Sequence, residues 1–98
     1  MIRVIYEFDV EPGKEAQLEQ AWREIVEAHA GEGALESTLT YDPEADGVRY
    51  VAISRWESHQ HWVDGRRDDA APDAYERFYD AVEVLDRRVL VEKETLRA

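Results

Sequence analysis

The chain has 98 residues, of which 44% are apolar and 36% charged, and its 12 basic and 23 acidic side chains give a formal net charge of −11. A chain of this length forms one small domain with a thin core, and a surface of this sign repels nucleic acids and anionic membranes. The absence of cysteine excludes a disulfide framework and a thiolate site. Acidic residues follow the N-terminus before an apolar signal segment could form, and no apolar run reaches membrane-spanning length, so we expect a cytoplasmic protein.

The first part of the chain predicts a strand and then a helix. Apolar residues occupy every second position from Ile2 to Val10, which is typical of a strand with one apolar face. Pro12 and Gly13 end this strand, and from Lys14 the apolar period becomes that of an amphipathic helix ending at Gly31. The apolar stripe of this helix contains Leu18, Ala21, Trp22, Ile25, Val26 and His29.

The second part predicts a hairpin, two helices and a last strand. Residues 35–41 and 50–56 are suited to antiparallel strands, and the turn residues between them favour a hairpin. Ser58 is a candidate N-cap for a short helix that runs to about Arg66, and Pro72 suits the first turn of another helix. The apolar face of that second helix is expected to contain Tyr75, Phe78, Tyr79, Val82 and Leu85. The last strand is expected at 89–96.

The order β-α-β-β-α-β predicts an α+β fold, a ferredoxin-like sandwich with an antiparallel four-stranded sheet and helices on one face, over residues 1–98 as a single domain. Apolar side chains remain for the second face of the sheet, and these are Ile5, Val51, Ile53, Val89 and Val91. Because one helical layer covers only one face, we expect a homodimer that packs sheet against sheet. Arg55, and similarly Arg3, are expected on this second face, where the candidate partners of Arg55 are Glu7, Asp9, Glu92 and Glu94.

Three features together resemble the antibiotic biosynthesis monooxygenase (ABM) superfamily. They are Glu11-Pro12-Gly13-Lys14-Glu15 at the start of a long helix, the hairpin, and Trp56-Glu57-Ser58 before a short helix. The resemblance spans nearly the whole chain and implies a dimeric α+β barrel with a ligand pocket between helices and sheet in each subunit. The superfamily includes cofactor-free oxygenases acting on polyketide phenols and quinols, haem-degrading enzymes and proteins of unknown activity.

The haem-degrading branch differs from this chain at three places. That branch has an asparagine on the first strand, where Tyr6 stands here, and a tryptophan late in the short helix, where this chain has Gly65. It also has a histidine haem ligand in the following helix, and the stretch from Pro72 to Leu85 contains no histidine. We therefore expect neither tight haem binding nor haem degradation.

The three histidines are the candidates for a general base, because only their side chains titrate near neutral pH without perturbation. His29, on the apolar stripe of the first helix, is interpreted as a cap of the last helical turn. His59 and His61 are the candidate catalytic residues. They lie about 200° apart on a helix, so we expect no shared metal ion.

Ten aromatic residues are many for so charged a chain, and most are expected in the core between sheet and helices. Tyr6, Trp62 and Tyr75 are the candidate substrate-binding residues of the pocket. No metal cluster or dinucleotide-binding motif occurs, so we expect no cofactor. Two hypotheses follow: a cofactor-independent monooxygenase acting on a small phenolic or quinol-like aromatic, or a dimeric ligand-binding or interaction module without turnover. A pocket lined only by apolar groups, with every histidine in solvent, would favour the second.

Overall fold

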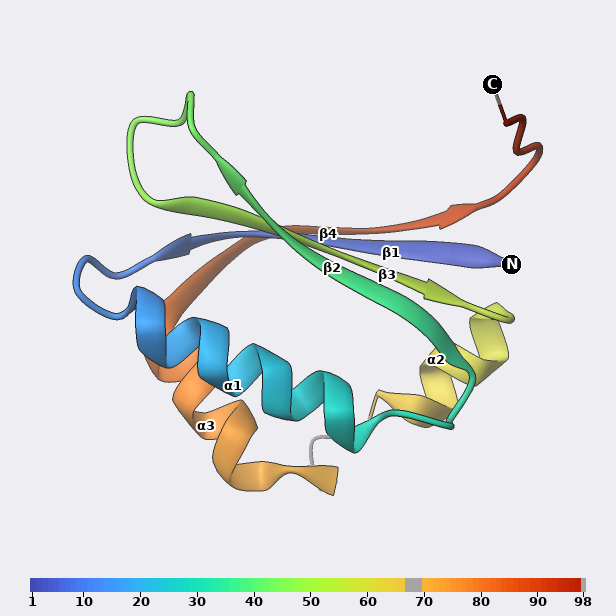
Figure 1. Cartoon of the computed structure of the whole chain (residues 1–98), viewed down its shortest axis with the longest axis horizontal. Coiled ribbons are helices and arrows are strands. Elements are labelled where there is room, and N and C mark those ends of the chain that lie inside the picture. The colour runs from blue at the N-terminus through green and yellow to red at the C-terminus, as the bar shows by residue number, and fades with distance from the viewer. Residues whose placement is uncertain (67–69, 98) are drawn as a thin grey trace.

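The computed structural model describes residues 1–66 and 70–97 and has the α+β ferredoxin-like architecture that the element order predicts. Its elements are β1 (Ile2–Val10), α1 (Glu15–Ala28), β2 (Ala34–Asp42), β3 (Arg49–Trp56), α2 (His59–Gly65), α3 (Pro72–Ala81) and β4 (Val82–Val91). The strands form one antiparallel sheet in the order β2-β3-β1-β4, and the helices all lie on one side of it (Figure 1). No helix within the described ranges combines the length and apolar character that a membrane span requires.

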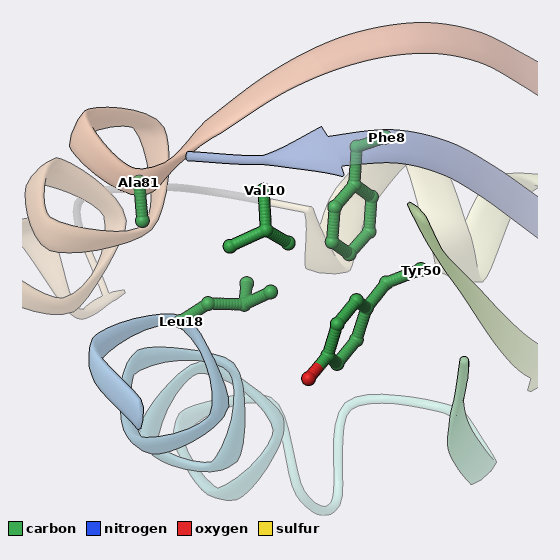
Figure 2. Close-up of a cluster of buried hydrophobic side chains, with 5 residues drawn as sticks. All are labelled: Phe8, Val10, Leu18, Tyr50 and Ala81. Carbon is green, nitrogen blue, oxygen red and sulfur yellow. The ribbon is translucent and has the colours of Figure 1, made fainter. Parts of the chain in front are cut away.

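A first core cluster joins α1 and α3 to the sheet (Figure 2). It consists of Phe8, Val10, Leu18, Tyr50 and Ala81, none of which is more than 9% exposed. Leu18 points from α1 towards β1, where the alternation of the strand turns Phe8 and Val10 to the helical side. The ring of Phe8 stacks on that of Tyr50 at 6.2 Å between centroids and meets Phe78 of α3 edge-on at 5.4 Å. Apolar and aromatic packing therefore holds both long helices against the middle strands.

A second core cluster lies under the other end of the sheet and involves α2. Its buried members are Ile2, Val4, Trp56 and Trp62. Ser58 caps α2 as expected, because its hydroxyl accepts a hydrogen bond from the backbone N–H of His61 at 3.1 Å. Tyr6 packs against both clusters. The core is therefore divided in two, with Tyr6 of β1 between the halves.

The ends of the predicted elements agree with the structure for the hairpin and α2 but not for the last helix and strand. The predicted end of the first helix at Gly31 is also wrong, because α1 ends at Ala28 and Gly31, with φ of +87°, lies in the turn that follows. α3 ends at Ala81, and Val82 is already extended, so the prediction of a helix through Val82 and Leu85 is wrong, as is a strand at 89–96.

The reason is a bulge in β4. Antiparallel pairing runs from Val10 opposite Val82 to Ile2 opposite Val91, so the strand matches the full length of β1. The register shifts between Glu7 and Phe8, and the extra residue on β4 changes which sequence positions face the helices. Because of this shift, the residues of β4 that face the helices do not follow a regular alternation in the sequence. Pairing along the full strand outweighs the local helical pattern.

The face of the sheet away from the helices is uncovered in the monomer. Ile5 lies opposite Ile53 and Val51 opposite Glu7, so these apolar side chains fall on that face as expected. The expectation for Val89 and Val91 is wrong, because they pair with Val4 and Ile2 and so share the helical face. Ile5, Val51 and Ile53 therefore occupy the middle of the open face, between clusters of charged residues.

Glu92 joins two arginines at one end of the open face. Its carboxylate accepts two hydrogen bonds from Arg55, at 2.6 and 3.1 Å, and one from Arg3 at 3.1 Å. Of the candidate partners expected for Arg55, the structure therefore selects Glu92. The hydrogen bonds from Arg55, together with Arg3 and the positive charge of both guanidiniums, lower the pKa of Glu92 from 4.5 to about 2.

The lowered pKa of Glu92 predicts a contribution to acid sensitivity. A carboxylate with a lower pKa in the folded than in the unfolded chain stabilises the fold above pH 4.5, and this stabilisation is lost as the pH falls towards 2. The free energy of unfolding of Glu92→Gln, measured by urea titration across that range, is expected to depend less steeply on pH than that of the wild type. Glu94→Gln, which alters an exposed carboxylate nearby, serves as the control. Equal slopes for the Glu92→Gln variant and the wild type would contradict this assignment.

Candidate functional site

A cavity of about 140 Å³ lies between the sheet and the helices. All three tryptophans of the chain, Trp22, Trp56 and Trp62, line it. Further aromatic walls come from Tyr6 and Phe8 on β1 and from Tyr75, Phe78 and Tyr79 on α3. A wall of this composition suits a flat aromatic molecule, which can stack on or meet the rings edge-on.

Small side chains on the sheet create the space. Ala52 and Ser54 of β3, with Ala34 and Ser37 of β2, line the cavity. Ala52 pairs with Tyr6 and Ser54 with Val4, so these small residues lie on the helical face between the two core clusters. Larger residues at these positions would fill the gap between the clusters, and the cavity therefore follows from the choice of side chains on β2 and β3.

Among the residues that the structure describes, His29 is the buried titratable group on the wall of this cavity. It is the C-cap residue of α1, is only 6% exposed and lines the cavity wall. Its Nε2 lies 2.6 Å from the hydroxyl oxygen of Tyr75, and its Nδ1 lies 3.2 Å from a carboxylate oxygen of Glu32. The rings of His29 and Tyr75 also meet edge-on at 5.9 Å between centroids. Elements distant in sequence, the end of α1 and the start of α3, thus bring an imidazole and a phenol into contact.

The partners of His29 define how it can handle a proton. An ionised carboxylate only accepts hydrogen bonds, so in the neutral ring Nδ1 donates to Glu32 and Nε2 is left as the acceptor of the Tyr75 hydroxyl proton. Nε2 is therefore the basic nitrogen and belongs to the cavity wall. The contact with Glu32 also holds the imidazole ring with Nε2 towards Tyr75.

The structure places the predicted substrate-binding residues together. Tyr6 of β1, Trp62 of α2 and Tyr75 of α3 all line the cavity, although their binding role stays a prediction. The hydroxyl of Tyr6 makes no hydrogen bond within residues 1–66 and 70–97. It is thus available to a ligand.

The predicted catalytic histidines lie elsewhere. His59 and His61 are exposed and are not among the residues that line the cavity. The Nδ1 of His61 lies 2.6 Å from the Ser58 hydroxyl and its Nε2 3.3 Å from Glu57, a local arrangement around the N-cap of α2. A catalytic role for either residue stays a prediction.

His29 lies at the end of the first helix as predicted, whereas its place on the cavity wall was not predicted from the sequence. The available signal was its position: His29 continues the apolar stripe of α1, eleven residues after Leu18. A titratable side chain on a buried stripe must find partners inside the protein. The sequence pattern does not identify these partners, because one of them, Tyr75, lies 46 residues further along the chain.

The structure shows the surroundings of two positions at which this chain differs from the haem-degrading branch. Gly65 faces the indole of Trp56, and a Cβ added there would lie 2.6 Å from a ring carbon, so no larger side chain fits without moving Trp56. Tyr6 occupies the cavity wall on β1. In the described ranges, no group of three or more histidine, aspartate or glutamate side chains could hold a metal ion.

Comparison with known families agrees with this architecture. The model of the family "Antibiotic biosynthesis monooxygenase" matches residues 1–77. The chain belongs to this family. No curated protein matches it significantly.

Solved structures share the fold at low sequence identity. The cofactor-independent oxygenase SnoaB from Streptomyces nogalater superposes with a TM-score of 0.81 at 18% identity, covering 99% of this chain and 97% of SnoaB. A conserved protein from Methanosarcina mazei Go1 gives 0.78 at 16% identity, covering 94% and 92% of the two chains. A further antibiotic biosynthesis monooxygenase gives 0.71 at 18% identity, covering 98% and 100%. At these identities the similarity establishes the fold of this ABM-family chain and leaves its chemistry to its own residues.

The residues at the positions that differ from the haem-degrading branch predict that this protein does not bind haem tightly. When the purified protein is titrated with one equivalent of haemin, the absorption spectrum is expected to remain that of free haemin. The stretch from Pro72 to Leu85 contains no histidine to bind the iron, and Trp56 occupies the space next to Gly65, where the haem-degrading branch has a tryptophan. A shifted Soret band at stoichiometric haemin, followed by its loss with reductant and oxygen, would show that the prediction is wrong. Gly65→Ala reports on the site itself and is expected to destabilise the fold through contact with Trp56.

Proposed function

We propose that this ABM-family protein is a cofactor-independent monooxygenase that oxidises a small phenolic or quinol-like aromatic in the cavity between sheet and helices. The observation that supports this most strongly is the buried His29, hydrogen-bonded to Tyr75 on the wall of an otherwise mainly aromatic cavity. The alternative, a ligand-binding or interaction module without turnover, predicts a pocket lined only by apolar groups and every histidine exposed to solvent. His29 departs from that condition, so the geometry favours the oxygenase.

The reaction balances without an added reductant. A phenol with a free para C–H and one O₂ give one quinone and one water: the substrate supplies four electrons, one oxygen atom enters the quinone and the other leaves as water. The hydroxyl first gives its proton to a base. The phenolate transfers one electron to O₂, and the phenoxyl and superoxide radicals join at the para carbon. The base returns its proton to the peroxide, and loss of hydroxide with the C–H proton releases water and leaves the quinone carbonyl.

The residues of the cavity supply the steps that a protein must provide. His29 acts as the general base through Nε2, with Tyr75 as the hydroxyl that relays the proton between substrate and imidazole. The free hydroxyl of Tyr6 positions the substrate oxygen. The aromatic walls exclude water from the charged intermediates and hold the ring plane. His29 replaces His59 and His61 as the proposed base, because a base must reach the substrate.

The oxygenase proposal predicts oxygen uptake by the purified, metal-free protein. With 1-naphthol or related electron-rich phenols, consumption of one O₂ per quinone is expected, and ¹⁸O₂ should place one labelled atom in the quinone and one in water. His29→Gln is expected to slow this uptake by roughly 10²-fold or more, because the base is lost while the side chain keeps its bulk. Tyr75→Phe should also slow it, since the ring remains and the relay is removed.

His59→Ala and His61→Ala are the matched controls and are expected to retain uptake, with circular dichroism confirming that each variant folds. If either control lost oxygen uptake while His29→Gln retained it, the general base would instead be a histidine of α2. If no phenol or quinol in a broad panel supported oxygen uptake, the ligand-binding module would be the better function.

The open face of the sheet supports a homodimer. Ile5, Val51 and Ile53 form an apolar centre there. Arg3, Arg55 and Glu92 form ion pairs towards one end, and Arg49 pairs with Asp9 at 3.0 Å towards the other. An apolar centre between charged borders is the composition of a protein interface, and a second copy offers the same pattern in reverse. The dimer covers the face that the helices leave open.

Light scattering is expected to give twice the 11.4 kDa chain mass at micromolar concentration. Ile53→Glu, which places a charge at the centre of the open face, is expected to shift the mass towards one chain. Leu96→Glu adds the same charge at a residue that is 84% exposed and should leave the mass unchanged. A wild-type protein of monomeric mass would contradict the dimer.

A further inference from the structure

The guanidinium groups of two arginines lie over the indole ring of Trp62. Arg66, the C-cap residue of α2, holds its guanidinium carbon 4.3 Å from the ring centroid, and Arg87 of β4 holds its own at 5.3 Å. Arg87 reaches this position because it pairs with Tyr6 on the helical face of the sheet. Trp62 and Arg66 both line the cavity, and Arg66 is exposed, so this pair lies where the cavity meets solvent.

These two guanidiniums differ from several other arginines that the structure describes. Arg49, Arg55 and Arg77 each form an ion pair with an aspartate or glutamate. Arg66 and Arg87 form none with the residues the structure describes, and the nearby Asp64 accepts a hydrogen bond from Gln60 instead. In a chain with 23 acidic and 12 basic residues, two unpaired guanidiniums beside one ring produce a local positive field at the cavity.

Within residues 1–66 and 70–97, no hydrogen bond or ion pair takes up the guanidinium N–H groups of Arg66 or Arg87. A guanidinium over an aromatic ring uses its planar face for the cation–π contact, while its N–H groups point outward in the plane. Those N–H groups match a carboxylate in a two-point hydrogen bond. The ring also limits the motion of the arginine side chains, so less conformational entropy is lost when an anion binds.

We infer that the cavity takes an aromatic substrate bearing a carboxylate, with the carboxylate held by Arg66 and Arg87 beside Trp62 and the aromatic body between the sheet and the helices. This inference rests on the proposed function for the aromatic body and adds the anionic substituent that the substrate carries. The phenol hydroxyl of the same molecule faces His29 and Tyr75. The arginines thus select among phenols that fit the aromatic walls equally well, and they offset the repulsion that a protein of charge −11 exerts on an anion.

The test is a binding comparison in oxygen-free buffer, so that no turnover is needed. Isothermal titration calorimetry with 6-hydroxy-2-naphthoate and with 2-naphthol compares two probes that differ only in the carboxylate. The wild type is expected to bind the carboxylate probe at least roughly 10-fold more tightly, and the preference should shrink as salt is raised. Arg66→Gln is expected to remove most of the preference, Arg87→Gln part of it, and both should still bind 2-naphthol as the wild type does.

Arg23→Gln removes one positive charge from an exposed position of α1 that does not line the cavity, and it should keep the full preference. Equal affinity of the wild type for the two probes, or an equal loss in Arg23→Gln, would overturn the carboxylate site. Oxygen uptake is measured separately. A carboxylate preference without any uptake would retain the site and reject the oxygenase, whereas uptake without the preference would do the reverse.

Discussion

The packing of two helices against one face of a four-stranded sheet is the constraint on which the other features of this protein depend. Leu18 of α1 and Ala81 at the end of α3 reach the same buried cluster on β1, so both helices are tied to the central strand (Figure 2). The two helices cover the sheet unevenly, and α2 covers the region beyond the end of α1 (Figure 1). One consequence is a core in two parts with a cavity between them. The other is a second sheet face with no cover in the monomer.

The cavity combines general packing with a small number of polar groups. Small residues on β2 and β3 open the space, and aromatic residues from β1, α1, α2 and α3 enclose it. His29, Tyr75 and Glu32 bring a proton acceptor with an oriented ring to one part of the wall. Arg66, with Arg87 next to it on the ring of Trp62, brings positive charge to another part. An apolar body with few converging polar groups is how binding sites obtain both affinity and orientation.

The strength of the site prediction differs between the aromatic residues and the histidines. Tyr6 lies on a strand whose alternation identifies its inner face, and Tyr75 lies on the apolar stripe of α3, so the local pattern already directed both inward. α2 has only seven residues, and a helix that short contains too few turns to reveal its inner side. Trp62 and Gly65 turned out to be its buried residues, which leaves His59 and His61 outside.

The sequence by itself determined the order of the elements, the α+β class, the alternating faces of β1 and the hairpin, because these depend on side-chain periods and turn residues that are local in the chain. It also carried the motifs that place the protein in its family. Only the tertiary structure decided where α3 gives way to β4, since pairing with β1 and a bulge outweigh the helical pattern around Val82. Only the tertiary structure brought His29 to Tyr75, and Arg66 to Arg87 across Trp62. Those contacts join residues far apart in sequence, and their partners are chosen by the way that helices and strands pack, which no local pattern records.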